Sequence, residues 1–151
     1  MQYRLFLTSI FLAAAAAAPA QSRTLSVSAG QSWTIERLYR VCDNPDTYCT
    51  WLFGIDPDTP GVAPTYCIYV VYAENATTPA SQSSGGPTAC GDYNVTSGWS
   101  GQFGPGKGFT TFSIIDYAKK LIAYPSYTDA IVANESLVQP DLSFPVSTLM
   151  L

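Results

Sequence analysis

Short runs of alternating hydrophobic and polar residues follow the apolar N-terminal segment, and this two-residue period is typical of β-strands. In residues 33–40, the side chains of Trp33, Ile35, Arg37 and Tyr39 are expected to share one face. A helix is the competing interpretation, but the β-branched and aromatic content of this run and of the next favours a strand. Further strands are predicted at residues 49–56, 65–73, 92–97, 109–116 and 144–149, with KKLIAYP (119–125) following the fourth of these.

A glycine-rich turn, residues 98–108, leads directly into the strand at 109–116. Its glycines permit positive φ angles, so no helix is expected to cross it. The strands at 65–73 and 109–116 are apolar on both faces, which predicts that both faces are buried. Strands that recur about every dozen residues between Gly, Pro and Asn turns predict an all-β fold, a single antiparallel β-barrel or sandwich.

Two segments carry no clear strand pattern. Residues 75–89, NATTPASQSSGGPTA, are small, polar and rich in turn formers, so a long and mobile surface loop is predicted there. Residues 127–141, YTDAIVANESLVQPD, are irregular and are expected to hold one helical turn or a short strand.

Residues 1–20 are typical of a secretory signal peptide. Arg4 precedes an apolar run at residues 5–18, and Ala18-Pro19-Ala20 provides the small side chains of a cleavage site. The run is shorter than the ~20 residues that span a bilayer, which disfavours a membrane anchor. We therefore expect a secreted mature chain, residues 21–151, that folds as a single β-barrel domain.

The charge of the mature chain excludes two classes of partner. Removal of the leader takes Arg4 with it and leaves six basic against eleven acidic side chains, a net charge of −5. Such a chain has no basic patch for nucleic acid and would be repelled by an anionic membrane. We expect neither as a partner.

Four cysteines in an exported chain predict two disulfide bonds, for which three connectivities exist. We favour Cys42–Cys49 and Cys67–Cys90, because the first pair flanks the turn sequence DNPDT between two predicted strands. The spacing does not fit a zinc site, and no histidine occurs in the chain, so no metal and no cofactor are expected.

The acidic residues offer one enzymatic alternative. A glycoside hydrolase needs two carboxyl groups on either side of its substrate, and the candidates here are Asp56 and Asp58, with Glu36, Asp92 and Asp116 as further partners. Acids in a proline-rich loop are more typical of a turn. We expect a protein that is not an enzyme, with a small glycoside hydrolase as the less favoured alternative.

Two kinds of surface feature are predicted. Asn75, Asn94 and Asn134 each begin an N-x-[ST] sequon and are candidates for glycosylation, with Asn75 preferred because it lies in the predicted loop.

Trp99, Phe103 and Lys107 lie in the glycine turn and are candidates for a recognition surface. The alternative is that the glycines only let the chain turn a barrel corner. Exposed aromatic side chains would also suit sugar rings, which keeps a carbohydrate-binding wall protein open.

The motifs resemble a known family. The run SGWSGQFGPGKGFTTFS (97–113) is the most specific, and LIAYPSYTD (121–129), CTWLFGID (49–56) and CGDYNV (90–95) accompany it. Together they look like the small secreted fungal proteins described as hypersensitive-response-inducing elicitors, and the layout is loosely similar to the mould major-allergen β-barrel. The resemblance implies a secreted β-barrel that is released into the plant apoplast; the fungal cell wall is the alternative location for a secreted chain. A plant receptor at the cell surface or in the apoplast would sense it, and defence and local cell death would follow.

Overall fold

The structure is a computed structural model that describes residues 27–150, with side-chain surroundings from Gly30 onward. The predicted signal peptide, residues 1–20, lies outside the described residues. The strands are β1 (Val27–Cys42), β2 (Tyr48–Asp56), β3 (Thr65–Tyr72), β4 (Gly85–Cys90), β5 (Tyr93–Ser100), β6 (Phe109–Asp116), β7 (Leu121–Ala123), β8 (Ser126–Thr128) and β9 (Leu142–Thr148). The helical segments are η1 (Ala80–Gln82), α1 (Asp129–Val132) and η2 (Ala133–Glu135). In the described part of the chain, none of these helices is long and apolar enough to cross a membrane.

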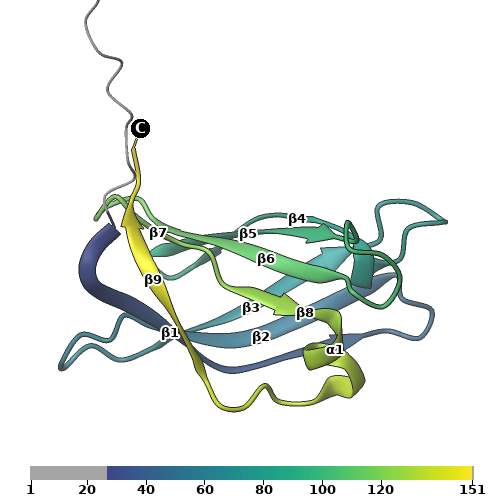
Figure 1. Ribbon diagram of the computed structural model, residues 1–151, viewed down its shortest axis with the longest axis horizontal. Helices are drawn as coiled ribbons and strands as arrows, with labels where there is room; N and C mark the ends of the chain where they lie inside the picture. The colour runs from purple at the N-terminus through teal and green to yellow at the C-terminus, as the bar shows by residue number, and fades with distance from the viewer. Residues whose placement is uncertain (1–26, 151) are drawn as a thin grey trace, which may run out of the picture.

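The strands form one antiparallel sheet in the order β3-β2-β1-β9-β7-β6-β5-β4, and β8 pairs with β6 beside this path. The sheet curls into a nearly closed barrel (Figure 1), in which β1 bends sharply and pairs with both β2 and β9. The two ends of the path, β3 and β4, are joined by the Cys67–Cys90 disulfide, whose Cα atoms are 5.3 Å apart. The Cys42–Cys49 disulfide clips the β1–β2 hairpin. Both predicted pairings and the all-β barrel are confirmed.

The inside of the barrel is an aromatic core centred on Phe112 of β6. Its ring centroid lies 5.0 Å from that of Trp51, 5.5 Å from Phe53 and 5.8 Å from Tyr69, with the Trp51 and Tyr69 rings edge-on. Edge-to-face contacts of this kind add to the free energy that burial of the rings already contributes. The two strands that supply these residues, β2 and β3, are therefore tied to β6, the strand that follows the glycine-rich turn.

One residue changes the face of β1. Arg37 has φ of 50° and the β1–β2 register shifts between Glu36 and Tyr39, which is a β-bulge. Because a bulge exchanges the inner and outer faces of a strand, the buried positions change from Trp33 and Ile35 to Leu38 and Arg40. The prediction that Tyr39 shares the face of Trp33 is therefore wrong.

The strand β3 is buried on one face only. Cys67, Tyr69 and Val71 point into the barrel. On the outer face, Tyr66, Ile68 and Tyr72 expose 63%, 66% and 68% of their surface. The prediction of burial on both faces is wrong here, because in a single-layer barrel the outer wall has no second layer to cover it.

The predicted loop at residues 75–89 is shorter than expected, since its second half is the edge strand β4 and η1 lies before it. Ala80 and Ser83 are buried. The carboxylate of Asp46 accepts the Ser81 N–H at 2.9 Å, and the Asp46 carbonyl accepts the Ala80 N–H at 2.9 Å. These bonds fix the segment against the β1–β2 hairpin.

Candidate functional site

The glycine loop, residues 101–108, joins β5 and β6 at one end of the barrel. It consists of two successive turns, in which the Gly104 N–H donates to the Gly101 carbonyl at 3.0 Å and the Lys107 N–H donates to the Gly104 carbonyl at 3.1 Å. Gly104 and Gly106 have φ of 96° and 74°, angles that only glycine adopts without strain. Two of the loop glycines are thus required by the backbone conformation.

Trp99, the residue at the base of the loop, is half-buried. Its Nε1–H donates to Oδ2 of Asp129 at 2.9 Å. A Cβ added at Gly101 would lie 2.5 Å from Cη2 of the indole, and one added at Gly108 would lie 2.8 Å from Cζ2. The backbone therefore passes directly over the indole, which supports the loop and also lines a hollow. A role of Trp99 in recognition stays a prediction.

The other two recognition candidates are exposed. Phe103 exposes 64% of its surface, and its ring stacks on Phe109 with centroids 5.7 Å apart and an interplanar angle of 29°. Lys107 is also exposed. Both border an apolar hollow of about 580 Å³ whose remaining lining residues are Gly106, Phe109, Ser126, Thr128 and Ala130. The loop thus presents one aromatic ring and one cation side by side.

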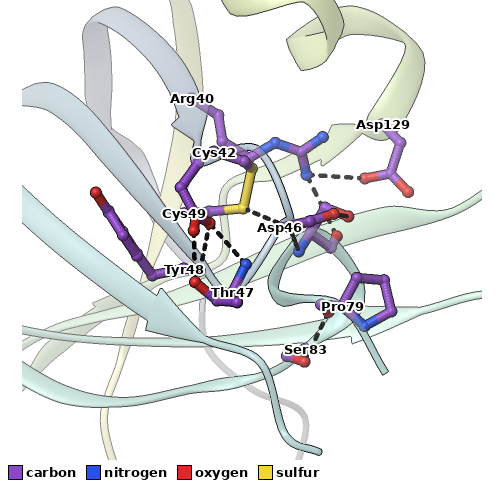
Figure 2. The surroundings of a disulfide bond; sticks show 11 residues. Arg40, Cys42, Asp46, Thr47, Tyr48, Cys49, Pro79, Ser83 and Asp129 are labelled. Atoms are coloured by element: carbon purple, nitrogen blue, oxygen red, sulfur yellow. Dashed lines mark hydrogen bonds and ion pairs between the residues drawn. A yellow bond between two sulfur atoms is a disulfide. The ribbon is translucent and has the colours of Figure 1, made fainter. Parts of the chain in front are cut away.

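A second hollow, of about 660 Å³, is also lined by the glycine loop, and Arg40 and Asp129 meet in it. Arg40 Nη1 donates to Oδ1 of Asp129 at 3.2 Å and to the Ser81 carbonyl at 3.3 Å (Figure 2). The Asp129 N–H in turn donates to the Gly108 carbonyl at 2.9 Å. Asp129 therefore connects Arg40 of β1, Trp99 of β5 and the end of the glycine loop.

The β1–β2 hairpin anchors the segment that carries Ser81, and this segment lines the second hollow. Figure 2 shows Asp46 beside the Cys42–Cys49 disulfide, facing the segment that carries Ser81. In the described residues, the one cluster of metal-ligand types is Cys42, Asp46 and Cys49. The two sulfur atoms are bonded to each other, so they offer no thiolate to a metal. The cluster serves the architecture of the hairpin.

The carboxylates considered for a hydrolase are engaged in local structure. Asp56 Oδ1 accepts the Asp58 N–H at 2.8 Å, and the Asp58 carboxylate accepts the hydroxyls of Ser32 at 2.7 Å and Thr34 at 2.9 Å. Desolvation, followed by the nearby charges of Asp56 and Asp141, raises the pKa of Glu36. The pair at Asp56 and Asp58 is arranged as a turn.

Two further acids lie elsewhere. Asp92 is exposed in the turn between β4 and β5. Asp116 is buried, accepts the Lys119 N–H at 2.9 Å and pairs with Lys119 Nζ at 3.1 Å. The hydrogen bond from Nζ to the Asp116 carboxylate, followed by the negative charge of that carboxylate, raises the pKa of Lys119.

The sequons differ in their surroundings. Asn75 is exposed, and its Oδ1 accepts the Thr77 N–H at 2.9 Å and the Thr77 hydroxyl at 2.7 Å. Asn94 is half-buried in β5, between β4 and β6. The side chain of Asn134 lies outside the described part. Glycosylation of Asn75, Asn94 and Asn134 stays a prediction.

Sequence reasoning did not single out Arg40 or Asp129. Arg40 points inward because of the bulge at Arg37, and no local sequence pattern predicts this bulge. Asp129 lies thirty positions from Trp99 in the sequence. The site is therefore built by contacts between distant segments.

Comparison with known proteins identifies relatives. The family model described as Effector TSP1 matches residues 34–149. A curated protein named Effector TSP1, from Hypocrea virens (strain Gv29-8 / FGSC 10586), is 48% identical over 142 residues, which cover 93% of each chain. Neither description mentions a hypersensitive response or an allergen. The match extends over the barrel, both disulfides and the glycine loop, and on this basis the chain belongs to the Effector TSP1 family.

Proposed function

We propose that this protein is a secreted fungal effector that plant tissue senses in the apoplast, and that the response is defence and hypersensitive cell death. Its membership of the Effector TSP1 family, together with a curated fungal relative of that name, carries this proposal. The protein acts by being bound and not by catalysis, since the carboxylates at Asp56 and Asp58 are used in a turn.

The surface of the glycine loop is the part that a plant receptor contacts. Phe103 and Lys107 are exposed there beside an apolar hollow of about 580 Å³. Aromatic side chains in or beside pockets contribute disproportionately to protein interfaces. Lys107 places a positive charge on the surface of a chain whose net charge is negative, so it can pair with acidic side chains on the receptor.

The test is infiltration of the folded, tag-free protein into leaf tissue, with cell death measured by ion leakage. We expect the Phe103→Ser, Lys107→Ala double variant to keep its melting temperature and to need about tenfold more protein for the same response. The matched control is Tyr117→Ser, Lys120→Ala, which removes an exposed aromatic ring and a lysine from the β6–β7 turn at the other end of the barrel.

Three outcomes would contradict the proposal. A wild-type protein that causes no more leakage than its reduced and alkylated form is not an elicitor. A double variant that matches the control variant places recognition elsewhere on the surface. Release of reducing sugar from plant or fungal wall polymers that is lost in Asp56→Ala would show an enzyme.

A further inference from the structure

Arg40 is a buried cation with unused hydrogen-bond donors. It exposes 8% of its surface, and its guanidinium lies over the ring of Trp51 at 5.1 Å from the centroid. Nη1 donates to Asp129 and to the Ser81 carbonyl. Among residues 27–150, the hydrogen bonds of Arg40 both come from Nη1. Nε and Nη2 are not among the buried side-chain atoms that lack a partner there, which are Asp116 Oδ2 and Tyr127 Oη. They therefore reach solvent and are available to a ligand in the hollow of about 660 Å³ that Arg40 lines.

The floor of this hollow, which we call the Arg40 hollow, is fixed before any ligand arrives. The Asp129 carboxylate is held from two sides, by Trp99 at 2.9 Å and by Arg40 at 3.2 Å. The half-buried indole of Trp99 supplies an apolar part of the floor, and its position is fixed by the backbone of Gly101 and Gly108. Groups held in place in this way lose little entropy when a ligand binds.

The wall of the Arg40 hollow leaves room for a ligand with many polar groups. Gly101, Gly104, Gly106 and Gly108 line it on the loop side together with Pro105, so few side chains narrow the hollow there. Gln82 stands on the opposite side, at the exposed end of η1. A volume of about 660 Å³ is within the range of small-molecule sites, roughly 300–1,000 Å³.

The charges around Arg40 disfavour an anion. Asp129 neutralises the guanidinium within the hollow. Behind it, Arg40 also borders a smaller hollow of about 350 Å³ that Asp46 and Glu135 line. A second carboxylate or a phosphate near these acids would be repelled. The ligand that fits has no net charge and carries groups that both donate and accept hydrogen bonds.

We propose that the Arg40 hollow binds the end of a neutral oligosaccharide. The hydroxyl groups of a sugar accept from Nε and Nη2 of Arg40 and donate to the remaining lone pairs of the Asp129 carboxylate. The apolar face of the sugar ring lies against the Trp99 indole. The site adjoins the Phe103 and Lys107 surface, with which it shares Gly106. Binding of sugar does not depend on whether a leaf responds to the protein.

The experiment is calorimetric titration of the mature protein with the β-1,4-linked tetrasaccharides of glucose, xylose and N-acetylglucosamine, and with tetragalacturonate as the acidic probe. We expect saturable binding of at least one neutral probe, with a change in tryptophan fluorescence. Gln82→Trp, which fills the mouth, should abolish it. The matched control is Gln102→Trp, on an exposed loop residue that does not line the hollow, and it should bind as the wild type does.

Asp129→Asn distinguishes a sugar site from a merely open space. We expect neutral binding to weaken about tenfold, the loss of one charge-assisted hydrogen bond. The proposal is overturned if none of the neutral probes binds, if Gln82→Trp binds as well as Gln102→Trp, or if tetragalacturonate binds best and gains affinity in Asp129→Asn. Because Gln82→Trp and Gln102→Trp leave the floor intact, the result stands even where Asp129→Asn fails to fold.

Discussion

Replacing Gly108 with alanine tests whether the glycine loop is held down by the Trp99 indole. The added Cβ would lie 2.8 Å from Cζ2 of the indole and would collide with Oδ2 of Asp129. Gly108 is buried and has no positive φ, so the collision is the penalty and backbone strain is not. Overpacking of this kind costs about 1–3 kcal/mol, and displacing the Asp129 carboxylate from the Trp99 N–H adds about 1.5–3 kcal/mol at most. We expect a loss of about 2–4 kcal/mol.

The matched control is Gly98→Ala in the neighbouring strand β5. An alanine Cβ at Gly98 would meet no atom within 4 Å, and Gly98 also has no positive φ. Alanine in a strand interior is about 0.5–1 kcal/mol better than glycine, so this variant should equal or slightly exceed the wild type. Melting curves followed by circular dichroism measure both, and a domain of this size loses about 3–5 °C per kcal/mol.

We therefore expect Gly108→Ala to melt about 10 °C below Gly98→Ala. A difference of less than about 2 °C would refute the reasoning, because the loop would then be free to move off the indole. Trp99 would in that case belong to the mobile surface, and the floor assigned to the Arg40 hollow would not be fixed.

Two further predictions concern the disulfides and one acid. Removing Cys67–Cys90 should cost more than removing Cys42–Cys49, about 3.5 against about 2.5 kcal/mol, because the sequence separations are 23 and 7; denaturant unfolding of the two double-alanine variants measures this, and equal losses would contradict the loop-length argument. Glu36 has a raised pKa in the folded state, so its contribution to stability is present below the ordinary value of 4.5 and is lost as the pH rises through the folded pKa. Glu36→Gln should then be more stable than the wild type at pH 7 and equal to it near pH 3, and a variant that is less stable at pH 7 would show that the carboxylate makes a net favourable contact.

The strand pattern and the disulfides could be predicted from the sequence because both depend on neighbouring residues. Alternation placed both ends of β2, β5, β6 and β9 within three residues of where they lie. The turn DNPDT between Cys42 and Cys49 predicted a hairpin, and a hairpin brings its two ends together. With Cys42 and Cys49 paired, Cys67 and Cys90 remained for each other.

The exchange of inner and outer faces along β1, and the pairing of β4, could not be predicted in the same way. Arg37 adopts a left-handed conformation that arginine seldom prefers, and its cause is tertiary: the Arg37 N–H donates to Asp141 Oδ1 at 2.8 Å, more than a hundred residues away. The strand β4, GGPTAC, contains few β-formers. It pairs with β5, where the Ser97 hydroxyl accepts the Gly85 N–H at 3.1 Å and lies 3.0 Å from the Tyr69 hydroxyl. Such contacts leave no periodic mark in the sequence.

The glycine cluster is explained by the architecture of the loop. Several glycines close together lose extra backbone entropy on folding, which invites the inference that the loop serves recognition. The structure gives architectural reasons for four of them: Gly104 and Gly106 need positive φ, and Gly101 and Gly108 lie against Trp99. Since the corner of the barrel needs these glycines, the entropy that they lose on folding is no evidence for a binding partner. Recognition must be argued from the side chains that the corner does not use, and Phe103 and Lys107 are such residues, because the turn conformation and the indole contact would be the same without them.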